Sequence, residues 1–199
     1  MILPVISRGV NFDLEEQDLA TVLAEGALIA AETTRVFGQL SAEQLNWKPG
    51  ETDWSIGQCF EHLVISNRPY LGIFDEILAG RRRPRLWERV PVLPRIFGRM
   101  LVKTLRPDSG RNVKARPAFR PSSSHIAPAI VTTFLDQQTR LLGLMEASRR
   151  LDLDRITITS PVLPLVTYSL MDACRIIVVH EQNHVVQAMR VTAMPQFPR

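Results

Sequence analysis

The residues in this chain best suited to chemistry are its four histidines, His62, His125, His180 and His184. His180 and His184 are four residues apart, a spacing that on a helix places two rings on one face about 40° apart. Neutral imidazole is a good ligand for Zn, Ni, Co, Cu or Fe. The spacing therefore indicates a metal-binding pair. A pair of hydrogen-bonded core histidines is the alternative interpretation.

The segment His180-Glu-Gln-Asn-His184 also matches the His-Glu-x-x-His pattern of zinc proteases, in which the glutamate acts as general base. A protease of this type needs a third ligand further along the chain. The residues after His184 contain neither the Gly-x-x-His continuation nor another glutamate. The match to a protease is therefore weak, and Glu181 remains a secondary candidate for catalysis.

A third histidine, His62, lies in the segment Trp54-Ser-Ile-Gly-Gln58-Cys-Phe-Glu-His62-Leu63, where helical periodicity begins again. Cys59, three residues earlier, is either a further ligand, a reactive thiol or a small buried residue, and the last interpretation is favoured. Gln58 either reaches the site or caps the helix, and capping is the simpler account.

Several other residues are expected to have structural roles. We expect His125 to be a residue at a helix start rather than a ligand, and Asp172 to belong to the cap of the last helix. Trp47 and Trp54 are expected to pack in the core.

Three motifs occur in order along the chain: Trp47-Lys-Pro49, then Asp53-Trp54-Ser55-x-x-Gln58-x-x-x-His62-Leu63, then the distant His-x-x-x-His pair. Together they resemble the DinB/YfiT-like superfamily. That resemblance implies a four-helix protein in which one histidine of the second helix and two of the last bind a divalent metal, with Zn or Ni expected. The ligands here would be His62, His180 and His184.

The resemblance also implies a class of activity. Similar proteins are described as metal-dependent hydrolases or as transferases that attach low-molecular-weight thiols to electrophiles, and homodimers are expected. Three imidazoles leave one position open on a tetrahedral ion, as in catalytic sites. We therefore expect a small-molecule substrate, with a non-catalytic metal-binding or stress-associated helical protein as the alternative.

Apolar residues recurring near the helical period predict an all-α four-helix bundle and a single domain over residues 1–199. Capping boxes at Ser41 and Ser55 mark a short helical turn and the start of the second helix. The four long helices are expected at 13–39, 55–80 (bent at Pro69), from after 124 to about 150, and 170–191, with a short amphipathic segment at 94–105. Residues 151–168 are expected to form an extended crossing loop.

Positive charge is concentrated in residues 81–120, which we call the basic arm. This arm holds 13 Lys and Arg residues against only Glu88 and Asp108, whereas the whole chain has a net charge of +4. We expect the arm to be an enlarged connection between the second and third helices, dispensable for the fold. A ridge formed by Arg95, Arg99 and Lys103 either binds an anionic substrate or is a solvated face. Sparse aromatic residues in the arm argue against nucleic-acid binding.

The composition is that of an ordinary globular domain, with 199 residues of which 45% are hydrophobic and 22% charged. Uninterrupted apolar stretches are far shorter than the roughly 20 residues of a membrane span. The N-terminal residues lack the basic region of a secretory signal, and two cysteines make no disulfide framework. We therefore expect a cytoplasmic protein without membrane contact.

Overall fold

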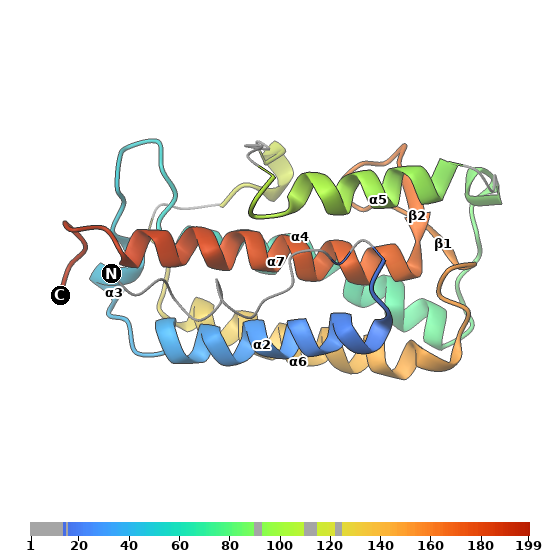
Figure 1. Cartoon of the computed structure of the whole chain (residues 1–199), viewed down its shortest axis with the longest axis horizontal. Helices are drawn as coiled ribbons and strands as arrows, with labels where there is room; N and C mark the ends of the chain where they lie inside the picture. The colour runs from blue at the N-terminus through green and yellow to red at the C-terminus, as the bar shows by residue number, and fades with distance from the viewer. Residues whose placement is uncertain (1–13, 15, 90–92, 110–114, 122–124) are drawn as a thin grey trace.

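Four long helices pack side by side in the computed structural model, which describes residue 14 and residues 16–89, 93–109, 115–121 and 125–199. They are α2 (Leu19–Phe37), α4 (Ile56–Leu78), α6 (Ala129–Ala147) and α7 (Leu170–Thr192). Both α2 and α4 pack against both α6 and α7, so the four helices form a closed ring (Figure 1). The predicted all-α fold is confirmed. Within the described residues, no helix combines the length and apolar character needed to cross a membrane.

Side-chain caps fix where most of the helices begin. Ser41 and Ser55 form the two predicted capping boxes, at α3 (Ala42–Asn46) and α4, and Ser169 caps α7 through the backbone nitrogen of Asp172. The Ser55 hydroxyl accepts from the Gln58 backbone nitrogen while the Gln58 side chain accepts from that of Ser55. Helix α4 continues through Pro69 as predicted.

Two helices start later than the sequence pattern predicted. The first begins at Leu19, not near residue 13, because the Asp18 carboxylate accepts a hydrogen bond of 2.9 Å from the Thr21 backbone nitrogen and so acts as the cap. Helix α6 begins at Ala129, directly after Pro128, rather than just after residue 124. Its C-terminal end is extended to residue 150 by the 3₁₀ turn η3 (Ser148–Arg150), as expected.

The core is built on α7, which is buried on nearly all sides. Phenylalanines from three other helices join across the interior. The Phe60 ring of α4 lies 5.1 Å from the Phe37 ring of α2 and 5.3 Å from the Phe134 ring of α6, centroid to centroid. These edge and tilted contacts fix the neighbouring helices at close packing distance.

Residues 151–168 were expected to form an extended crossing loop, but part of this segment forms a β-hairpin. They include strand β1 (Thr157–Thr159) and lead into β2 (Thr167–Ser169), which pair antiparallel with Ile158 opposite Tyr168. Both of these side chains are fully buried. β-Branched and aromatic residues favour a pleated, half-buried surface, and this pair turns the short crossing segment into a hairpin next to α7.

The basic arm folds back onto the bundle. It contains η1 (Leu86–Arg89), α5 (Leu93–Leu105) and η2 (Pro117–Phe119), and α5 packs against α7 and β2 (Figure 1). Val102 of α5 is fully buried in the common core. Gly98 lies so close to Asp172 that a Cβ atom there would overlap the carboxylate. This packing argues against an arm that is dispensable for the fold, because the amphipathic α5 buries its apolar face against the bundle.

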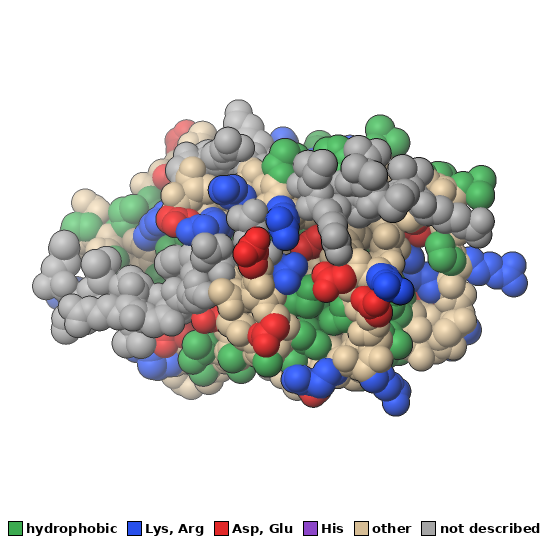
Figure 2. Space-filling model, turned by 45° about the vertical axis from the view of Figure 1, so that its right-hand side comes forward, with side chains coloured by type: hydrophobic (Ala, Val, Ile, Leu, Met, Phe, Trp, Pro, Cys, Tyr) green, Lys and Arg blue, Asp and Glu red, His purple; other side chains and the backbone are tan. Residues whose placement is uncertain are grey.

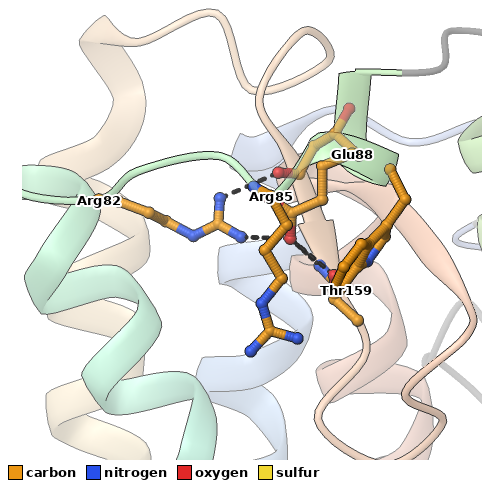
Figure 3. A network of polar contacts seen from close by, with 6 residues as sticks. Arg82, Arg85, Glu88 and Thr159 are labelled. Atoms are coloured by element: carbon orange, nitrogen blue, oxygen red, sulfur yellow. Dashed lines mark hydrogen bonds and ion pairs between the residues drawn. The ribbon is translucent and has the colours of Figure 1, made fainter.

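A buried carboxylate attaches the start of the arm to the hairpin (Figure 3). Glu88 accepts hydrogen bonds from Arg82 at 2.7 Å, from the Arg85 backbone nitrogen at 2.9 Å, and from the backbone nitrogen and hydroxyl of Thr159 at 2.8 and 2.7 Å. Burial acts to raise the pKa of Glu88, but these hydrogen bonds and the Arg82 charge outweigh it and lower the pKa. Glu88 is therefore ionised in the folded protein at neutral pH.

We expect Val102→Ala to lower the free energy of unfolding by about 2 kcal/mol, because two buried methyl groups are lost and a cavity remains. Lys103→Ala, at the exposed neighbouring position, is the matched control and should change it by less than about 0.5 kcal/mol. Urea unfolding followed by circular dichroism measures both. Equal stability of Val102→Ala and wild type would mean that α5 is only loosely attached.

Glu88→Gln should destabilise the protein by about 1–3 kcal/mol at neutral pH, because the Arg82 charge loses its partner. The pKa of Glu88 is lower in the folded protein than the value of about 4.3 in the unfolded chain. The ionised carboxylate therefore stabilises the folded protein above about pH 4.3, and this stabilisation is lost as the pH falls through the folded-state pKa. The difference in Tm between wild type and Glu88→Gln should therefore shrink on acidification below about pH 4. A difference independent of pH would contradict this assignment.

Candidate metal centre

Three of the four histidines meet between α4 and α7. His62 comes from α4, and His180 and His184 come from consecutive turns of α7. One nitrogen of each ring lies within 4.8 Å of the others, and the Nε2 atoms of His62 and His180 are 3.1 Å apart. Ring centroids are 4.6–5.0 Å apart. We call these three residues the histidine cluster.

Hydrogen bonds outside the cluster orient two of its rings. The Nδ1–H of His62 donates to the Phe119 carbonyl oxygen of η2 at 2.6 Å, because a carbonyl can only accept. The Nδ1–H of His184 donates to Gln187 Oε1 at 2.9 Å. In both rings Nε2 therefore keeps its lone pair. Metal-binding histidines are commonly oriented in this way, with the second ring nitrogen held by a carbonyl.

The cluster is held in the neutral form. Burial lowers the pKa of His62, and burial together with repulsion from the other two rings lowers that of His180 well below its usual value. Burial, reinforced by His62, lowers the pKa of His184 to about 3. Neutral imidazole is the form that binds metal ions. On the face shown in Figure 2, where acidic and basic side chains are interspersed, no described histidine reaches the surface.

The spacing of the nitrogens suits a small divalent ion. Bonds of about 2.0–2.1 Å in tetrahedral geometry place two nitrogens about 3.3 Å apart, close to the 3.1 Å between His62 and His180. Without a cation, the Nε2–H of His180 can donate to the Nε2 lone pair of His62 at this distance. The histidine cluster thus forms a group that could hold a metal ion.

Trp54 forms one wall of the site, a role that the sequence did not reveal. Its ring stacks on His184 at 5.7 Å with an angle of 20° between the planes, and it lies 5.0 Å from His62. Trp47 instead packs edge-on against Phe197, in agreement with the expected structural role. The position of Trp54 directly before the Ser55 cap gives no local signal of a site contact, because the histidines of α7 are distant in sequence.

A cavity of about 620 Å³ adjoins the histidine cluster. Its walls come from α4, α5, α7, η2 and the turn between the two strands. The basic arm thus supplies one side of the cavity. Such a volume is typical of small-molecule sites.

Glu181 faces away from the cavity even though it follows His180 directly. Its carboxylate is fully buried and accepts hydrogen bonds of 2.7 Å from both Asn67 and Gln138. Burial raises the pKa of Glu181 to about 8. Glu181 is not among the residues that line the cavity. The structure therefore does not bring this candidate base to the histidine cluster.

The remaining candidates of the sequence have structural surroundings. Cys59 is fully buried, burial raises its pKa to about 12, and it does not join the cluster. Gln58 takes part in the cap of α4. His125 is exposed and precedes α6 by four residues, so it lies outside the helix start and outside the cluster. Asp172 follows the Ser169 cap and pairs with Arg175 at 2.9 Å.

The expected ridge of the basic arm does not reach the cavity. Arg99 and Lys103 are exposed on α5, and Arg99 lies 3.6 Å from Glu16; the side chain of Arg95 falls outside the described residues. Three other arginines line the cavity instead: Arg106 and Arg116 of the arm, and Arg190 of α7. The sequence pattern missed them because the packing of the arm against α7, and not helical period alone, decides which side chains line the cavity.

The family assignment agrees with this geometry. A family model of the DinB superfamily matches residues 28–188, a span that contains all four long helices in whole or in part and the entire histidine cluster. The chain belongs to the DinB superfamily. No curated protein and no solved structure gives a significant match.

Single replacement of His62, His180 or His184 by Ala should reduce bound divalent metal from about one ion per chain to near zero, because two imidazoles without a third ligand hold zinc or nickel weakly. His125→Ala is the matched control and should retain full occupancy. Elemental analysis of protein purified without an affinity tag measures the ratio. Unchanged metal content in His62→Ala or His184→Ala would contradict the ligand assignment.

Proposed function

We propose that the protein is a divalent-metal-dependent enzyme in which His62, His180 and His184 hold the ion, with zinc or nickel the expected metals. The donor set supports this proposal, because three neutral imidazoles suit these ions and occupy three of four tetrahedral positions. The observation that carries the proposal is the cavity next to the histidine cluster. A purely structural metal site would be closed by a fourth protein ligand.

The reaction class is activation of water or of a low-molecular-weight thiol, giving a hydrolase or a thiol S-transferase. A bound divalent ion lowers the pKa of a water or thiol in contact with it and so supplies a nucleophile near neutral pH. The residues of the chain do the rest. Phe119 and Gln187 keep two ligand rings in the correct tautomer, while Trp54 shields one side of the cluster from solvent.

A small-molecule substrate would enter the cavity, and the arginines lining it favour an anionic one. Homodimer formation, a cytoplasmic location and the absence of nucleic-acid binding remain predictions of the sequence. The same is true of a non-catalytic metal-binding role, which is the alternative to an enzyme.

Replacement of Glu181 by Gln separates the thiol mechanism from a protease-like one. Because the carboxyl group is buried between Asn67 and Gln138 and faces away from the cavity, Glu181→Gln should keep kcat within about tenfold of wild type. His180→Ala should lose activity together with the metal. Conjugation of thiols to a panel of electrophiles and hydrolysis of a panel of esters and amides measure both variants at known metal content.

Two outcomes would change the proposal. A loss of kcat by a factor of about 1,000 or more in Glu181→Gln at full metal occupancy would favour metal-assisted hydrolysis with Glu181 as base. Full metal occupancy without turnover of any panel member would favour the non-catalytic metal-binding role.

A further inference from the structure

The cavity has two chemically different ends. On one side of the histidine cluster its walls are mainly apolar, with Leu101 and Leu105 of α5 and Ile176 and Ile177 of α7. Tyr70 and Tyr168 also line the cavity, and both are buried. Their hydroxyl groups bond to each other at 2.5 Å, so each already has a partner. This end suits an uncharged, apolar group.

The opposite side is polar and cationic. Beyond His184 on α7, the cavity is lined by Gln187 and then by Arg190, which is exposed. Among the described residues no carboxylate forms an ion pair with Arg190. Arg116 instead donates to the Val162 carbonyl oxygen at 2.6 Å, and Arg106 is held by Asp108. No aspartate or glutamate belongs to the described lining of the cavity. The uncompensated positive charge favours an anion here.

The order of these groups along the helices sets their separation. At 1.5 Å per residue, Arg190 lies about 9 Å beyond His184 along α7, and Ile176 lies about 6 Å before His180. On α4, Tyr70 lies about 12 Å beyond His62. The histidine cluster is therefore in the middle of the cavity, between its apolar and its cationic end.

We propose that the cavity binds an amphiphilic anion, with an alkyl or aryl part between α5 and α7 and an acidic group near Arg190. The inference builds on the proposed function, because such a ligand would place its central bonds at the histidine cluster. Arg190 would be the residue that selects for the negative charge, and Leu101 and Leu105 would select for the apolar part.

Octane-1-sulfonate is a suitable probe because a sulfonate is always ionised and binds metal ions poorly. Isothermal titration of the full chain, both after chelator treatment and after zinc loading, should give at least tenfold tighter binding for octane-1-sulfonate than for butane-1-sulfonate. Octyltrimethylammonium, which has the same chain and the opposite charge, should bind at least tenfold more weakly than octane-1-sulfonate.

Two variants test the named residues. Arg190→Gln should weaken octane-1-sulfonate at least fivefold, and the exposed Arg150→Gln is its matched control. Leu101→Asn should reduce the advantage of the octyl over the butyl chain, and circular dichroism checks that it folds. Equal binding of sulfonate and ammonium, no dependence on chain length, or an unchanged affinity in Arg190→Gln would overturn the proposal.

Sulfonate binding tests the amphiphile site separately from the proposed metal-dependent activity. Sulfonate binding to the chelator-treated protein does not depend on a bound ion, so a negative result leaves the metal assignment intact. Conversely, a chain that binds no metal but prefers octane-1-sulfonate would retain the amphiphile site and lose the proposed chemistry.

Discussion

The contact between α4 and α7 is the constraint on which the rest of the site depends. His62 is far from His180 and His184 in the sequence, and only the packing of these two helices brings its Nε2 to within 3.1 Å of that of His180. Three uncharged rings at this distance are costly to bury without partners. The bonds to Phe119 and Gln187 satisfy the outward nitrogens of two rings, and a cation would satisfy the inward ones.

The basic arm supplies one side of the cavity that adjoins the histidine cluster. Its amphipathic helix α5 packs against α7, and its 3₁₀ turn η2 supplies the carbonyl that orients His62. The arm is attached at its start by the buried Glu88 and along its length by Val102. The same segment therefore contributes to stability, to the geometry of the histidine cluster and to the charge of the cavity.

The polar group behind the cluster has a different role. Glu181, Asn67 and Gln138 form hydrogen bonds in the fully buried interface of α4, α6 and α7. Most buried polar groups are paired, and although Gln138 Oε1 has no partner among the described residues, the bonds that Glu181 accepts favour one alignment of the three helices. Because Glu181 is next to His180, that alignment also fixes the position of the cluster. The glutamate of the His-Glu-x-x-His match thus takes part in helix packing in this protein.

The sequence by itself determined the features that depend on residues close together in the chain. Helical periodicity, the serine caps at residues 41, 55 and 169, and the spacing of His180 and His184 each involve residues within a few turns of one another, so the all-α fold and the histidine pair could be predicted. The resemblance to the superfamily added His62. Tertiary structure alone decided that Trp54 faces the histidines, that Glu181 turns away from the cavity, and that Arg190 lines the cavity while Arg99 does not. Each of these depends on contacts between segments distant in sequence, and no local preference of the chain specifies them.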